Sequence, residues 1–366
     1  MKFSVKLISW YEINKRHLPW RNTPDPYKIW ISEIILQQTR VDQGFEYYNN
    51  FVKKFPDVRS LAESDEQDVL KLWQGLGYYS RARNLHLTAR EIVSIYQGHF
   101  PANYKDILKL KGIGEYTAAA ICSFAFDLPY PVVDGNVMRF LSRLKGLEIA
   151  VNTIPGKKTI TTLATELMDK NQPGIFNQAI MEFGALYCKP LNPDCNSCIF
   201  KFDCLAHLTG KVRELPLKEK QVKQKSRYFY YLLLKSGSQG LPYIYLRKRV
   251  GNDIWKNLYD FPLVESDKRL PKNQIRDKIE KLLDHSGIYN LRFIPKNYRH
   301  ILTHRIIHAQ FIMVEFTGDI IVTSIEKSMH NNLIKVHQRE INLYPIPRLI
   351  EKFMEENDVF GGIEVG

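Results

Sequence analysis

The sequence predicts a two-domain protein: an all-α domain over residues 1–205, a linker over 206–225, and an α+β domain over 226–366. A chain of 366 residues is longer than most single compact domains. Apolar residues recur with helical spacing as far as residue 205, whereas runs rich in β-branched and aromatic residues begin near residue 226. The stretch between them is polar and Lys-rich, which is typical of a linker.

End signals and apolar spacing predict the helices in order. The first is an amphipathic helix at the N-terminus, with apolar residues on one side: Phe3, Leu7, Ile8 and Tyr11. Asp25 and Pro26 open a second helix as N-cap and first residue. Ser64 with Gln67 resembles a capping box for a helix that ends at 75–77. Further helices are predicted at 79–97, 104–111, 115–126 and 175–187.

The C-terminal domain is predicted from three strand-like runs, at 227–235, 243–250 and 305–316. Helices are predicted at 274–285 and 347–356, the second beginning with a proline.

Charge indicates the class of partner. Lys and Arg number 52 and Asp and Glu 39, a net charge of +13, which favours a polyanion such as nucleic acid over a merely basic soluble enzyme. The N-terminus lacks the apolar core and cleavage site of a signal peptide, and no run of about 18 apolar residues predicts a membrane span. We expect a cytoplasmic monomer that is associated with the nucleoid in a bacterium.

Four cysteines form the pattern C-x6-C-x2-C-x5-C: Cys188, Cys195, Cys198 and Cys204. In a reducing compartment such a group favours a metal over disulfides. Its asymmetric spacing favours a [4Fe–4S] cluster over tetrahedral zinc, which stays open as the alternative. Four thiolates leave no coordination site for chemistry, so we expect a structural role that presents Lys189 and Lys201 to phosphate. Cys122 lies in an apolar run and is read as a small buried residue.

The run LKGIGEYTAAA at 110–120 joins two helices through Gly112, Ile113 and Gly114. Such a turn exposes the backbone N–H groups at a helix start, which bind a DNA phosphate without reading sequence. A plain helical hairpin with Ile113 in the core is the alternative.

Two carboxylates are candidates for chemistry. Glu33 lies among apolar residues, and desolvation there would raise its pKa and suit it to general-acid catalysis. Asp134 and Asn136 stand at the start of a helix, where an aspartate can also be only an N-cap. A solvent-facing position is the alternative for Glu33.

The motifs together resemble those of the helix-hairpin-helix, iron–sulfur DNA glycosylases, and most closely the adenine DNA glycosylase (MutY) branch. They are PWR at 19–21, SEIILQQTRV at 32–41, GLGYYSRARNL at 75–85, LKGIGEYTAAA at 110–120, VVDGNVMRFLSRL at 132–144 and FNQAIMEFGALYC at 176–188. In the endonuclease III branch, a lysine in the second hairpin helix forms a Schiff base that leads to strand cleavage. Tyr116 stands at that position and cannot do so. The resemblance therefore implies a monofunctional glycosylase that removes adenine opposite 8-oxoguanine or guanine.

The resemblance implies roles for the site residues. Glu33 would protonate N7 of adenine, and Asp134 would stabilise or trap the oxocarbenium-like sugar, as in retaining glycosidases. Asn136 would orient Asp134 or the water, and Tyr116 would position the pair. Once the base is flipped out, the adenine pocket would be lined by Trp20, Arg21 and Gln178. The residues that fill the gap and touch the opposite base would be Gln38, Thr39, Leu76 and Tyr78.

The C-terminal domain resembles the Nudix-like domain of this family, without the glutamate-rich metal-binding helix of Nudix hydrolases. The loop that commonly reads Phe-Ser-His there is Leu302-Thr303-His304 here, so lesion contact is assigned to Thr303 and His304. Lys111 precedes the hairpin turn where the family frequently has proline. Two other readings stay open, a bifunctional glycosylase/lyase and a non-catalytic iron–sulfur DNA-binding sensor.

Overall fold

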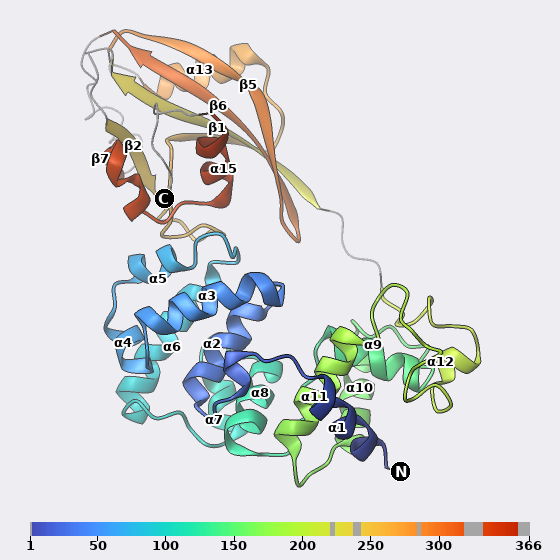
Figure 1. Ribbon diagram of the computed structural model, residues 1–366. Coiled ribbons are helices and arrows are strands. Elements are labelled where there is room, and N and C mark those ends of the chain that lie inside the picture. The colour runs from blue at the N-terminus through green and yellow to red at the C-terminus, as the bar shows by residue number, and fades with distance from the viewer. Residues whose placement is uncertain (1, 220–223, 237–242, 284–286, 318–331, 358–366) are drawn as a thin grey trace. The chain divides into compact units, whose positions relative to one another are not determined.

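The computed structural model (Figure 1) describes residues 2–219, 224–236, 243–283, 287–317 and 332–357. They form two compact units. The first comprises residues 1–64 and 84–221, and the second comprises 65–83 and 222–366. The segment 65–83 therefore groups with the C-terminal residues, which its place in the sequence does not suggest.

The first unit is helical. Its elements are α1 (Phe3–Asn14), η1 (Pro19–Arg21), α2 (Pro26–Leu36), α3 (Val41–Lys54), α4 (Val58–Glu63), most of α6 (Ser80–Tyr96), α7 (Tyr104–Lys109), α8 (Glu115–Phe126), α9 (Gly135–Leu144), α10 (Ile154–Leu167), α11 (Pro173–Leu186) and α12 (Leu205–Leu208). Helix α2 is central, because every residue from Ile29 to Ile35 is buried, and it packs on α3 and α8. Helix α11 packs on α1, α8 and α9. It therefore joins two groups of helices, one that contains α1, α9 and α10 and one that contains α2, α3 and α8.

A large core cluster holds the group of α1, α9, α10 and α11 together. Leu7 and Tyr11 of α1 enter it with Phe140, Phe176 and Phe183. The predicted apolar side of the first helix is thereby confirmed. Partly buried residues at the edge of this cluster include three of the four clustered cysteines, Cys188, Cys198 and Cys204.

The second unit contains α5 (Glu66–Leu72) and two sheets. A four-stranded sheet has the order β4-β1-β6-β5, with β1 (Lys225–Ser236) parallel to β6 (Arg305–Phe316) and antiparallel to β4 (Leu263–Ser266). β5 (Tyr289–Ile301) is antiparallel to β6. A three-stranded antiparallel sheet has the order β3-β2-β7, formed by β3 (Tyr259–Asp260), β2 (Tyr243–Lys248) and β7 (Leu333–His337).

Helices cover the four-stranded sheet on both faces. Because successive side chains of a strand point to opposite faces, Leu232 and Leu234 lie in one core cluster with Ile279 of α13 (Lys272–Leu282). On the other face, Phe311 of β6 stacks on Phe353 of α15 (Arg348–Asn357) at a centroid distance of 3.6 Å. A short helix, η2 (Gln338–Leu343), precedes α15.

The predicted helices and the three predicted strands are confirmed, with small shifts at their ends. Predicted position 283 lies just beyond α13, and 284 and 285 lie outside the described residues.

One predicted helix start was wrong. Ser64 is the C-cap of α4 and its hydroxyl donates to the carbonyl of Leu61, whereas Asp65 accepts from the backbone N–H of Gln67 and opens α5. Helix α5 ends at Leu72, before the glycines at 75 and 77.

The stretch 206–225 is not a free linker along its whole length. Its first residues belong to α12, and Leu215 is buried. The backbone N–H of Val151 donates to the carbonyl of Leu217, and Arg143 donates to that of Leu215. The segment is polar in composition, yet its backbone carbonyls accept hydrogen bonds from the helical unit as far as Glu219, whose carbonyl accepts from the Asn152 side chain.

Among the described residues, the helices lack the combination of length and apolar character that crossing a bilayer requires.

Candidate active site in the helical unit

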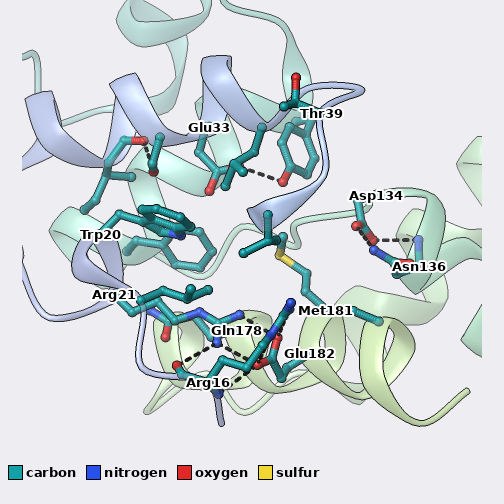
Figure 2. Close-up of a pocket in the computed structure, with 18 residues that line it drawn as sticks. Arg16, Trp20, Arg21, Glu33, Thr39, Asp134, Asn136, Gln178, Met181 and Glu182 are labelled. Atoms are coloured by element: carbon teal, nitrogen blue, oxygen red, sulfur yellow. Dashed lines mark hydrogen bonds and ion pairs between the residues drawn. The ribbon is translucent and has the colours of Figure 1, made fainter. Parts of the chain in front are cut away.

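A pocket of about 220 Å³ opens between the two groups of helices in the first unit. Most of the predicted chemical residues line it: Trp20, Arg21, Glu33, Thr39, Tyr116, Asp134, Asn136 and Gln178. They come from segments as far apart as η1 and α11, and Figure 2 shows Glu33 and Gln178 on opposite walls.

Glu33 is a buried carboxyl group of this pocket, with 7% of its surface exposed. The neighbouring positions of α2 from Ile29 to Ile35 are buried as well, and the Glu33 side chain lines the pocket. The Tyr116 hydroxyl donates to its Oε2 at 2.6 Å. Burial raises the pKa of Glu33 to about 7, against the lowering effects of the Tyr116 hydrogen bond and of Arg21, while Asp134 raises it further.

Asp134 is held differently, as the N-cap of α9. Its Oδ1 accepts from the backbone N–H groups of Asn136 and Val137 at 2.9 and 2.7 Å, and its Oδ2 accepts from the Asn136 side-chain amide at 2.7 Å. Burial raises the pKa of Asp134, whereas these three hydrogen bonds and Arg139 lower it. Asp134 therefore caps α9 and lines the pocket with the same carboxylate.

A chain of hydrogen bonds leads from Asp134 towards the cysteines. The side-chain amide oxygen of Asn136 accepts from the guanidinium of Arg139 at 2.9 Å, and Arg139 also donates to the backbone carbonyls of Gly184 and Cys188 at 2.6 and 2.8 Å. These contacts fix the Asn136 side chain, and with it the orientation of Asp134.

Glu182 is a pocket residue that the sequence analysis missed. Its side chain is fully buried and accepts two hydrogen bonds from Arg21, at 2.9 and 2.7 Å, and two from the Arg16 guanidinium, at 2.9 and 2.6 Å. Burial alone would raise the pKa of Glu182, but the hydrogen bonds from Arg21 and Arg16 lower that pKa to about 2. A signal was available, since Glu182 lies four residues after Gln178 and so on the same face of α11.

Glu182→Gln should destabilise the fold by about 3 kcal/mol, because two guanidinium groups would face each other without a countercharge. Urea unfolding at pH 7 measures this loss. The pKa of Glu182 lies below its unfolded value, so the stabilisation is present above about pH 4.5 and is lost as the pH falls towards 2. Equal stability of variant and parent at pH 7 would contradict the role of Glu182 as a buried countercharge.

The helical hairpin has the geometry that its glycines predict. Gly112 has φ +79°, and a Cβ there would come within 2.7 Å of the Asn84 side chain. Ile113 is buried, as the alternative interpretation also requires. Gly114 is the N-cap of α8 and has no side chain with which to cap the first N–H groups of that helix. Lys111, just before the turn, is exposed.

The other predicted DNA contacts do not line the pocket. Gln38 is exposed at the end of α2 and has φ +58°. In the second unit, Leu76 is buried, and Tyr78 is 45% exposed in a left-handed conformation with φ +47°. The Tyr78 hydroxyl lies 3.0 Å from the Thr303 hydroxyl, and Thr303 and His304 are exposed in the turn between β5 and β6.

The four clustered cysteines line one small cavity of about 30 Å³, together with the buried side chain of Arg143 and several aromatic residues. N–H groups donate to sulfur atoms here: Arg143 donates to Cys188 Sγ at 3.5 Å, and the Phe200 backbone donates to Cys198 Sγ at 3.4 Å. Although they line one cavity, these cysteines, like the other potential ligands among the described residues, do not form a group of three or more arranged to hold a single metal ion. Cys122 is buried, as predicted.

Comparison with known proteins decides the family. Residues 31–170 match the family model described as HhH-GPD superfamily base excision DNA repair protein, and residues 230–356 match that of the NUDIX domain. An adenine DNA glycosylase of Buchnera aphidicola subsp. Baizongia pistaciae is 35% identical over 336 residues, covering 90% of this chain and 91% of that protein. The chain belongs to the adenine DNA glycosylase family. The resemblance drawn from its motifs is thereby confirmed.

Two further likenesses agree with this family. The adenine DNA glycosylase of Buchnera aphidicola subsp. Schizaphis graminum is 36% identical over 303 residues, covering 80% of this chain and 86% of that protein. A solved structure of a thermostable thymine-DNA glycosylase matches with a TM-score of 0.53 and 30% identity, covering 57% of this chain and 95% of that one. As a member of the adenine DNA glycosylase family, the chain is a DNA glycosylase of base-excision repair.

Proposed function

We propose that this protein removes adenine paired with 8-oxoguanine or guanine in double-stranded DNA by hydrolysing the N-glycosidic bond of a flipped-out nucleotide. The observation that carries the proposal is that Glu33 and Asp134 line one pocket and that Glu33 has a pKa of about 7. Such a value places a proton on a carboxyl group near neutral pH, where an ordinary glutamate has lost it.

Glu33 is the general acid in this proposal. Adenine is a poor leaving group as an anion, so its N7 must gain a proton while the bond to C1′ breaks. Tyr116 donates to Oε2 of Glu33, which leaves Oε1 to face the base. A tyrosine at this position also forms no Schiff base, so the proposal is for base removal without strand cleavage.

Asp134 acts on the sugar. As the base leaves, positive charge develops at C1′ and the ring oxygen, and a nearby carboxylate stabilises that charge or forms a bond to C1′ that water later hydrolyses. The helix N–H groups and the Asn136 amide that bind Asp134 favour its charged form and fix its direction. Asn136 is a positioning residue for Asp134 or for the water.

The remaining predicted residues are proposed to bind the DNA. Trp20, Arg21 and Gln178 would hold the flipped adenine, and the uncapped α8 N-terminus after Gly112 and Gly114 would bind a phosphate. The residues proposed to fill the gap and touch the opposite base are Gln38, Thr39, Leu76, Tyr78, Thr303 and His304. The hydroxyls of Tyr78 and Thr303 already contact each other, which supports their assignment to one lesion-contacting surface.

We also propose that Cys188, Cys195, Cys198 and Cys204 hold one [4Fe–4S] cluster. The donor set fits, because four soft sulfur ligands line one cavity and N–H donors face two of them. When bound, the cluster would cross-link the loop 188–204 and supply no catalytic site of its own. Lys189 and Lys201 of that loop would then face DNA phosphate.

The purified protein should be yellow-brown and contain iron and acid-labile sulfide in equal amounts, about four of each per chain. Metal analysis with the absorption spectrum provides the measurement. Colourless protein with one zinc ion per chain would instead show that the four thiolates form a zinc site.

The test of the function uses three duplexes, with 8-oxoguanine opposite adenine, guanine opposite adenine, and 8-oxoguanine opposite cytosine. We expect base loss from the first two and none from the third, with strand breaks only after hot alkali. Strand cleavage without alkali would show a lyase, and binding without base loss from any duplex would support a non-catalytic DNA-binding protein.

A further inference from the structure

A buried tyrosine outside the pocket contacts two of the proposed adenine-binding residues. Tyr11 of α1 is 3% exposed and does not line the pocket. Its hydroxyl donates to Oε1 of Gln178 at 2.6 Å, and the guanidinium of Arg21 lies 5.8 Å from its ring centroid. Arg21 is in turn fixed by its paired hydrogen bonds with Glu182. Tyr11 therefore links the Gln178 amide to the charged network beside it.

The contact decides which end of the Gln178 amide faces the pocket. A side-chain amide has an oxygen that accepts and a nitrogen that donates, and rotation by 180° exchanges them. Tyr11 does not line the pocket and binds the amide oxygen, which leaves the NH₂ group as the end of the amide available to a base in the pocket; Figure 2 shows Gln178 on the wall opposite Glu33. Burial raises the pKa of Tyr11, so its hydroxyl stays protonated and remains a donor.

We propose that Tyr11 is a positioning residue for base specificity, because it holds the Gln178 amide with its NH₂ group towards the base. A base atom that meets this group must be an acceptor. Adenine offers unprotonated ring nitrogens, whereas hypoxanthine carries a proton on N1 and an oxygen on C6. A fixed NH₂ group can donate a hydrogen bond to the unprotonated N1 of adenine, but it opposes the N1–H of hypoxanthine. An amide that is free to rotate would accommodate either base. This inference rests on the proposed adenine excision.

Tyr11→Phe tests the proposal, because it removes the hydroxyl and keeps the ring under Arg21. The matched control is Tyr27→Phe. Tyr27 is also 3% exposed, and its hydroxyl donates to the carbonyl of Phe55 at 2.7 Å, outside the pocket. Single-turnover excision is measured on duplexes with adenine or hypoxanthine opposite 8-oxoguanine, with the dissociation constant of each duplex.

The ratio of excision rates, adenine over hypoxanthine, should fall by about tenfold in Tyr11→Phe, the effect of about one hydrogen bond, and stay at the parent value in Tyr27→Phe. Duplex affinity should not change in either variant. In a Gln178→Ala background, Tyr11→Phe should leave the ratio unchanged, which a general loss of packing would not do. An unchanged ratio in Tyr11→Phe alone, or an equal fall in Tyr27→Phe, would overturn the inference. If the parent protein removes no adenine, the proposed function itself fails, and that result is distinct from an unchanged ratio.

Discussion

Glu33→Gln should lower the rate of adenine excision by about a thousandfold. Glutamine has almost the shape of glutamate and can still accept the Tyr116 hydrogen bond, but it has no proton to give to N7 of the base. The measurement is single-turnover excision from duplex with 8-oxoguanine opposite adenine, together with the dissociation constant for the same duplex. Binding should be retained, because the substitution removes a proton donor and no DNA contact.

Glu63→Gln is the matched control for this variant. Glu63 is the last residue of α4, is exposed, and does not line the pocket, so the same chemical change there should leave the excision rate at the parent value. Excision by Glu33→Gln at more than about a tenth of the parent rate would rule out Glu33 as the essential acid.

Asp134→Asn should lower excision by about a hundredfold to a thousandfold while the protein stays folded. Asparagine is as good an N-cap as aspartate, so α9 keeps its start, but the negative charge that faces the developing oxocarbenium is lost. Single-turnover excision and thermal unfolding are measured side by side. The expected result is a large loss of rate with little change in the unfolding temperature.

Asp57→Asn makes the same change at another N-cap. Asp57 caps α4 by accepting from the backbone N–H of Ser60, away from the pocket. It should change neither the rate nor the fold by much. If Asp134→Asn unfolds the protein, or if it keeps the parent rate, then Asp134 is only the cap that its position in the sequence also allows.

The sequence was informative wherever local chemistry determines the outcome. Glu33 stands among apolar residues of α2, so its burial and raised pKa could be predicted, and the structure confirms both. Asp134 immediately precedes a helix, and its capping contacts are local. The run at 305–316 is confirmed as β6 with the same ends, because aromatic and β-branched residues fill it.

Contacts between residues distant in the chain could not be predicted from sequence alone. The spacing of Glu182 from Gln178 places both on one face of α11, but its ion pairs with Arg16 and Arg21 depend on residues from the other end of the unit. The same holds for Tyr11, whose partner Gln178 is 167 positions away. β5 was missed because it is an edge strand with little burial and a register shift between Phe293 and Asn297.

The grouping of segment 65–83 with the C-terminal residues is another such case. Gln74 donates to Glu351 at 2.9 Å and accepts from the backbone N–H of Ile346 at 3.2 Å. Tyr79 donates to the carbonyl of Ile346 at 3.3 Å. Nothing in the local sequence indicates these partners, since they depend on tertiary pairing alone.

The central claim is that excision needs the protonated form of Glu33, and the pH dependence of single-turnover excision tests it most directly. Since Glu33 has a pKa of about 7, the rate should level off near pH 6, where Glu33 is protonated and Asp134 still charged, and fall about tenfold per pH unit above about pH 8. Tyr116→Phe removes a hydrogen bond that lowers this pKa, so the falling limb should move to higher pH. A rate that rises through pH 7, or a limb that moves to lower pH in Tyr116→Phe, would contradict the claim.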